Sequence, residues 1–105
     1  MNMLTHEQVQ QWLQPDWHIP GVRGWCTTRA GDISGPPYDG FNTANHVGDD
    51  PVAVANCRQA LAQYFHWHRQ PQWLKQVHGV AVVDARADGV EREADAVYSC
   101  EPGQI

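Results

Sequence analysis

Long apolar segments are missing from this sequence, in which no apolar run exceeds four residues, the length of Val80 to Val83. A helix that spans a membrane needs roughly 20 apolar residues, so we expect neither a membrane span nor a membrane partner. The first ten residues include His6 and Glu7 and have no basic block followed by an apolar one. This segment therefore lacks the composition of a secretory signal peptide.

Positive charge is also scarce, with seven Lys and Arg residues against twelve Asp and Glu and a formal net charge of −5. Lys75 is the single lysine. Nucleic-acid-binding proteins present clusters of Lys and Arg to the phosphate backbone. The composition leaves no basic face for this purpose, so nucleic acid is not an expected partner.

Cysteines are few, and Cys26, Cys57 and Cys100 form no C-x-x-C motif. An odd number of widely spaced cysteines fits reduced thiols in a cytoplasmic protein better than a disulfide framework. Cys26 falls in a predicted strand and Cys57 in a predicted helix, so we expect both in the hydrophobic core.

The residues that are present can form one domain. The chain has 105 residues, of which 42% are hydrophobic and 18% charged, a composition that argues against global disorder. Five Trp and six His residues are many for this length. Such side chains pack, stack on ligands or bind metals, so they are the first place to look for function.

A short N-terminal helix is predicted in the first 20 residues. Segment 5–8, Thr-His-Glu-Gln, has the form of a capping box. Val9, Trp12 and Leu13 would then share the buried face, and Pro15 would end the helix. A strand is predicted next, over Gly21 to Thr28, followed by an irregular segment from Ala30 to Asp50 that is rich in Gly, Pro, Asp and Asn.

A second helix is predicted from Asp50, a good N-cap, and Pro51, which suits the first helical position, to about His66. Further strands are predicted over 73–78, 80–84 and 94–99, with a loop at 85–93 and a turn at 101–103. The fold class is therefore α/β, or α+β, with mixed sheets packed against helices.

His46 and His78 are candidate metal ligands, because imidazole is the commonest ligand for transition metals. Asp49 and Asp50 could complete a site with His46. Equally, His46 could close a loop and His78 could occupy a turn. A metal site needs about three protein ligands, and spacing alone leaves both interpretations open.

His66 and His68 lie two residues apart, a spacing that suits a shared metal only on a strand. They fall at a predicted helix end, where His complements the helix dipole, so a structural role is favoured. Arg29 follows the predicted strand and precedes a Gly-rich loop. Its planar guanidinium could bind an anion, or it could pair with Asp32 or Asp39.

Five segments occur in an order that resembles a known family. They are Thr-Thr-Arg-Ala-Gly at 27–31, Pro-Tyr-Asp-Gly-Phe-Asn at 37–42, His-Val-Gly-Asp-Asp-Pro at 46–51, Trp-Leu-Lys-Gln-Val-His-Gly at 73–79 and Ala-Asp-Ala-Val-Tyr-Ser at 94–99. Over residues 21–105 the chain resembles the N-terminal part of the YfiH family. Members are also called laccase-domain or polyphenol oxidase proteins, peptidoglycan editing factors and purine nucleoside phosphorylases.

The resemblance implies a cytoplasmic metalloenzyme that phosphorolyses purine nucleosides, with adenosine deamination and editing of peptidoglycan precursors also attributed to the family. It implies zinc, with copper as the alternative. His78 inherits the role of metal ligand and catalytic residue. Arg29, Asn42 and His46 match substrate-pocket positions, with phosphate assigned to Arg29. Aromatic side chains at 38 and 41 could stack on a purine or simply pack the loop.

The family's other metal ligands lie in an Ala-Asp-Cys and a His-Ala-Gly-Trp segment, which residues 1–105 do not contain, and Cys100 is not one of them. The resemblance thus implies that residues 1–105 are the N-terminal part of a single domain with an incomplete metal site, and that residues 1–20 are a helical lead-in. The alternative is a truncated, non-catalytic relative that acts as a binding or association module. Such a chain would expose Trp73, Val82 and Val97.

Overall fold

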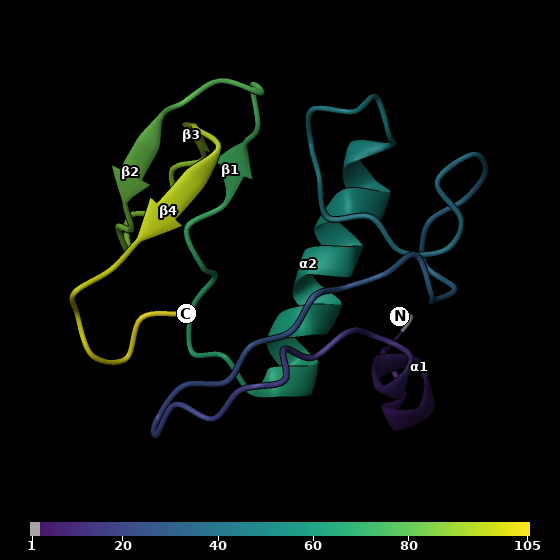
Figure 1. Cartoon of the computed structure of the whole chain (residues 1–105). Coiled ribbons are helices and arrows are strands. Elements are labelled where there is room, and N and C mark those ends of the chain that lie inside the picture. Colours follow the sequence, from purple (N-terminus) through teal and green to yellow (C-terminus); the bar gives the residue numbers. More distant parts are fainter. Residues whose placement is uncertain (1–2) are drawn as a thin grey trace.

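The computed structural model describes residues 3–105, so Met1 and Asn2 of the expected lead-in lie outside the described residues. A long helix stands between a group of short strands and a short helix (Figure 1). The elements, in chain order, are α1 (His6–Gln10), α2 (Pro51–Phe65), β1 (Leu74–Lys75), β2 (Val82–Asp84), β3 (Arg92–Glu93) and β4 (Ala96–Tyr98). This mixture of helices and parallel strands confirms the predicted α/β class.

Helix α1 begins with the predicted capping box. The backbone N–H of Gln8 donates to the Thr5 hydroxyl at 3.2 Å, and the backbone N–H of Thr5 donates to the side-chain oxygen of Gln8 at 2.9 Å. Val9 and Trp12 are buried as expected. Leu13 is 63% exposed, so its predicted place on the buried face is wrong. Its backbone turns away from the helix and bridges Cys26 instead.

The strand predicted over 21–28 does not form. Its pairing with the rest of the molecule is the single antiparallel bridge between Leu13 and Cys26. A strand is stabilised by a ladder of cross-strand hydrogen bonds, and one bridge does not propagate. Gly21 has a φ of 79°, which also interrupts extended backbone. Cys26 is consequently exposed, which corrects the prediction that it lies in the core.

Helix α2 forms as predicted and supplies much of the core. The Asp50 carboxylate accepts the Val52 N–H at 3.0 Å, and the helix ends where His66 adopts the left-handed conformation. Cys57 is fully buried, which confirms its predicted place in the core. The core cluster joins α1, α2 and the loop between them, and its buried members are Leu4, Val9, Trp12, Phe41, Cys57, Ala60 and Leu61.

The strands form two separate two-stranded sheets, β1 with β3 and β2 with β4, and both pairs are parallel. Strand β3 lies inside the segment predicted as a loop over 85–93, so that prediction is wrong in part. The strand forms because the Arg92 N–H donates to the Trp73 carbonyl at 3.2 Å, a contact between distant segments. The other strands fall within their predicted ranges but are shorter.

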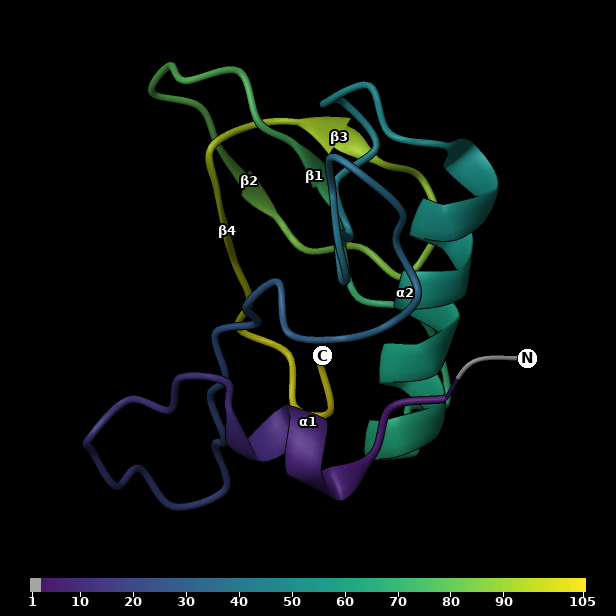
Figure 2. The same ribbon diagram turned by 90° about the vertical axis from the view of Figure 1, so that its right-hand side faces the viewer.

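The two sheets lie beside the N-terminal half of α2, whereas α1 lies near the C-terminal end of α2 in both ribbon views (Figure 2). A hydrogen bond of 2.9 Å between His6 Nδ1 and the Tyr64 hydroxyl ties α1 to that end of α2. Within residues 3–105, no helix has the length and apolar character needed to cross a membrane.

Candidate functional site

Two of the predicted site segments lie at the N-terminal end of α2. The segment 43–50, which leads into α2, and the turn that follows β1 both reach this end of the molecule in the two ribbon views. His46 belongs to the first segment and His78 to the second. The loop 30–41 lies on the other side of α2 from the strands (Figure 1). The fold therefore does not bring the Arg29 loop to the His78 turn.

Asn42 shapes the loop that carries His46. Its amide nitrogen donates to the Asp49 carboxylate at 3.1 Å and to the Ala44 carbonyl at 3.2 Å. Its amide oxygen accepts the Ala44 N–H at 3.1 Å. Asp49 also accepts the N–H of Asp50 at 2.7 Å. The Asn42 side chain is thus occupied by its own loop and sets the path of residues 42–50.

His46 has one ring nitrogen, Nδ1, that is buried and has no hydrogen-bond partner among the described residues. Buried polar atoms are nearly always paired in folded proteins, so an unpaired imidazole nitrogen is a candidate ligand-binding atom. Asp49 and Asp50 are engaged with Asn42 and the start of α2. The interpretation in which these carboxylates complete a metal site with His46 therefore gains no support from the geometry.

His78 lies in an exposed turn and has a φ of 57°, in the left-handed region that L-residues seldom adopt. Asp95 holds this turn, because its Oδ2 accepts the Gly79 N–H at 2.8 Å. The other carboxylate oxygen of Asp95 is buried and has no partner among the described residues. Sequence reasoning did not select Asp95, although it lies in the 94–99 segment that carries the family resemblance.

Arg29 is exposed, and its Nε donates to the backbone carbonyl of Asp39 at 2.7 Å. The predicted pairing with Asp39 is thus found, but with the main chain rather than the carboxylate. This bond fixes one edge of the guanidinium. Because the residue is exposed, the other edge is accessible to an anion from solvent.

The two aromatic residues of the same loop pack within the protein. Phe41 is 5% exposed, and its ring lies 5.3 Å from that of Trp12. The Tyr38 hydroxyl donates to the Val47 carbonyl. Of the two interpretations offered for these rings, packing of the loop is the one that the structure supports.

No group of three His, Cys, Asp or Glu side chains within residues 3–105 converges in a way that could hold a metal ion. The donors described here therefore do not fit a complete zinc or copper site. His66 and His68 are both exposed, and His66 ends α2, as the structural interpretation expected. His78 could supply one imidazole to a site whose other ligands come from elsewhere.

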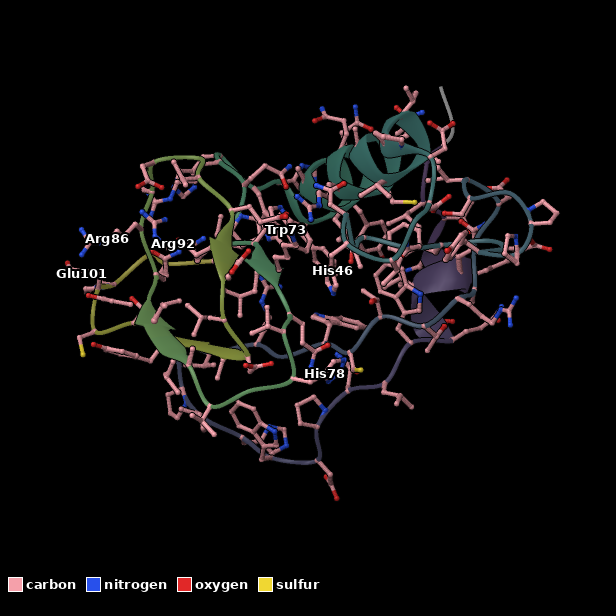
Figure 3. The ribbon with its side chains drawn as sticks, turned by 90° about the horizontal axis from the view of Figure 1, so that it is seen from above. His46, Trp73, His78, Arg86, Arg92 and Glu101 are labelled. Carbon is pink, nitrogen blue, oxygen red and sulfur yellow. The ribbon has the colours of Figure 1, made fainter. Side chains whose placement is uncertain are left out.

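A separate charged cluster lies at the far side of the strands. Figure 3 shows Arg86, Arg92 and Glu101 well away from His46 and His78. Arg92 contacts Asp88 at 2.6 Å, and its hydrogen bond holds the pKa of the Asp88 carboxyl well below its usual range. The same contact raises the pKa of Arg92. The Asp88–Arg92 pair stabilises the segment before β3 and is not part of the candidate site.

Two cavities lie beside α2. The smaller, of about 320 Å³, is lined by Arg58, Trp73 and Glu91 among others. The larger, of about 760 Å³, is lined mainly by aromatic and apolar side chains, including Trp25, Phe65 and Val97. The lining residues of these two cavities include neither His46 nor His78.

Comparison with known proteins identifies the class. Residues 23–105 match the family model described as multi-copper polyphenol oxidoreductase laccase. The chain therefore belongs to this laccase-domain family, the YfiH family, which confirms the resemblance seen in the sequence.

Individual relatives carry enzyme names. A protein of Pseudomonas aeruginosa named purine nucleoside phosphorylase is 47% identical over 90% of this chain. The protein of Escherichia coli K12 named purine nucleoside phosphorylase YfiH is 39% identical over 92% of it, and a purine nucleoside phosphorylase of Haemophilus influenzae is 38% identical over 90%. The matched part covers 38–39% of the length of these relatives.

Proposed function

We propose that this chain is the N-terminal part of a single-domain purine nucleoside phosphorylase, which transfers the ribosyl group of a purine nucleoside to inorganic phosphate. A phosphate oxygen bonds to C1′ of the ribose as the bond from C1′ to the base nitrogen breaks, and the base leaves with a proton. The supporting observation is the turn at His78, in which a strained backbone is held by a half-buried carboxylate beside an exposed imidazole. Strained residues held by their surroundings cluster at functional sites.

In this proposal each candidate residue has a distinct role. His78 is the metal ligand and so takes part in catalysis, and its position is set by Asp95 through Gly79. His46 offers its unpaired Nδ1 to the nucleoside, and Asn42 keeps the His46 loop in shape. Arg29 is the phosphate-binding residue that the family resemblance implies, through the exposed edge of its guanidinium, and its loop must move toward the His78 turn for both residues to act in one site.

The proposed metal is zinc, with copper as the alternative, and its other ligands lie outside residues 3–105. Such a metal acts as a Lewis acid at the substrate. We extend the proposal to adenosine deamination and to editing of peptidoglycan precursors, the other activities that the family resemblance implies. The three unpaired cysteines fit a cytoplasmic location, where thiols stay reduced.

The test is a chimera in which this chain replaces the matching segment of the Pseudomonas aeruginosa relative. We expect the chimera to form ribose 1-phosphate and hypoxanthine from inosine and phosphate. His78→Ala should lower this rate by more than about 100-fold, because even outer-shell partners of metal ligands are worth roughly 10–100-fold. His68→Ala is the matched control and should leave the rate unchanged. Full activity of the His78→Ala chimera would overturn the proposal.

A second candidate function is association with another polypeptide, and a specific observation favours it. Both faces of the β2–β4 sheet are open, since Val82 is 60% exposed, Val97 42% and Tyr98 53%. Parallel sheets are normally covered on both faces. Trp73 does not share this exposure, because it packs against the core cluster. The proposed association surface therefore consists of the two open faces of this sheet, with Val82 and Tyr98 on one face and Val97 on the other.

A further inference from the structure

We infer that Arg58 and Glu91 form a latch that positions the 43–46 segment of the candidate site. The inference rests on the proposed function, in which Asn42 and His46 border the substrate. Neither Arg58 nor Glu91 belongs to a site predicted from the sequence, and nothing in the proposed chemistry requires them. Their side chains nevertheless connect the His46 loop to α2 and to the strands.

The contacts of Arg58 define the latch. Its Nε donates to the backbone carbonyl of Thr43 at 2.9 Å, and a terminal nitrogen donates to the Glu91 carboxylate at 2.7 Å. Its guanidinium carbon lies 4.3 Å from the centre of the Trp73 ring. One side chain of α2 thus touches the site loop, the segment before β3 and the segment before β1.

Glu91 completes the connection. The carboxylate oxygen that accepts from Arg58 also accepts the Asn45 side-chain amide at 3.4 Å. The site loop is therefore held at two places, through the Thr43 carbonyl and through the Asn45 amide. Because one of these bonds goes to the main chain, it fixes the path of the loop itself.

The ring under Arg58 is also fixed. The Trp73 indole N–H donates to the Gln70 side chain at 2.8 Å, and the Gln70 amide donates to the Arg58 carbonyl at 3.3 Å. The side chains of Arg58 and Glu91 are only 14% and 27% exposed. An ion pair with this little exposure is screened less than a surface pair. Lys could not replace Arg58, because it has neither the planar fork nor the stacking face.

The loop needs such support because residues 43–48 contain no helix or strand, whereas α2 and β3 do. His46 follows Asn45 directly. The position of its unpaired nitrogen therefore depends on a segment that Arg58 and Glu91 hold through hydrogen bonds to Thr43 and Asn45. Arg58 and Glu91 act through this loop and are positioning residues. A loss of the latch should disorder 43–46 while α2 and β3 keep their structure.

Amide hydrogen exchange of the 105-residue chain tests the latch without any substrate. Arg58→Ala should raise the exchange rate of the Ala44 amide, which donates to Asn42, by at least about tenfold, the scale of one lost hydrogen bond to a charged group. Glu91→Gln keeps an oxygen acceptor, so it should raise the exchange rate of the Ala44 amide less than Glu91→Ala does. Arg69→Ala removes a guanidinium hydrogen bond to a different carbonyl, that of Gly103, and should leave the Ala44 exchange rate unchanged.

The chimera supplies a second readout. If the latch positions the substrate loop, Arg58→Lys should raise KM for inosine several-fold and leave kcat nearly unchanged, a split that general loss of stability does not produce. Unchanged exchange at Ala44, or a uniform rise across α2 and β3, would overturn the latch. An unchanged KM would overturn its role at the site. An inactive chimera would refute the proposed function, and the exchange data would still decide whether the latch exists.

Discussion

At the scale of single residues, Gly40 is where the irregular loop crosses itself. The Gly40 N–H donates to the Arg29 carbonyl at 2.9 Å, and its own carbonyl accepts the N–H groups of Ile33 and Ser34. A side chain at this position would collide with the backbone of Gly31, since an added Cβ would lie 1.8 Å from the Gly31 carbonyl oxygen. Glycine is required here because two stretches of main chain touch.

Gly40→Ala should therefore lower the free energy of unfolding by more than about 2 kcal/mol, because backbone must move to admit the methyl group. Chemical denaturation followed by Trp fluorescence measures the change. Gly35→Ala is the matched control in the same loop, where an added Cβ meets nothing within 4 Å. The explanation fails if the two variants unfold at the same denaturant concentration.

At the scale of elements, β3 depends on one buried side chain. Gln72 is 7% exposed, and its oxygen accepts from the Arg86 N–H at 3.2 Å and from the Arg92 guanidinium at 2.7 Å. Its nitrogen donates to the carbonyls of Trp73 and Val90. Residues before β1 and before β3 are thus joined by a single amide, which stabilises a strand of only two residues.

The contact between Asp88 and Arg92 should make this element sensitive to acid. The hydrogen bond from Arg92 lowers the pKa of Asp88 in the folded protein, whereas in the unfolded chain it returns to about 3.9. The folded state then binds fewer protons, so this contribution is complete above about pH 5 and is lost as the pH falls below about 4.

Unfolding measured from pH 6 to pH 2.5 checks this sign. We expect the stability difference between the wild type and Asp88→Asn to shrink as the pH falls. In an Arg92→Gln background the pH dependence of that difference should weaken, and the hydrogen bond that the Val90 N–H donates to Asp88 should keep part of it. A difference that stays constant across the range would contradict the assignment.

At the scale of the whole molecule, the two parallel sheets are left open. The residues of β4 are all exposed, and Val82 on β2 projects apolar surface beside them. Two-stranded sheets are marginal in water unless another layer covers them. The matched part covers 38% of the length of the Pseudomonas aeruginosa relative.

The isolated chain should consequently self-associate as its concentration rises, through the open faces of the β2–β4 sheet, which carry Val82, Val97 and Tyr98. The double variant Val82→Lys, Val97→Lys should shift it toward the monomer in size-exclusion chromatography with light scattering. Val52→Lys is the control, because Val52 is equally apolar and 65% exposed but lies on α2. A wild-type chain that is monomeric at every concentration would count against association.

The sequence pointed to the residues of the candidate site, which remain predictions, but it did not point to the side chains that support them. His46, His78, Asn42 and Arg29 stand out because their segments follow the order found in the family. Asp95 was missed as a support because it acts on a turn 16 residues away in sequence. Such partners are chosen by the tertiary fold, so spacing along the chain does not reveal them.

The sequence by itself determined α2, the start of α1 and membership of the family. Helix caps and helical hydrogen bonds join residues a few positions apart, so the Asp50-Pro51 start and the capping box of α1 predict their helices directly. Only the tertiary structure decided that β3 exists, that Cys26 is exposed and that Arg58 meets Glu91. Each of these depends on pairing or packing between segments far apart in the chain, and local sequence does not encode which distant partner arrives.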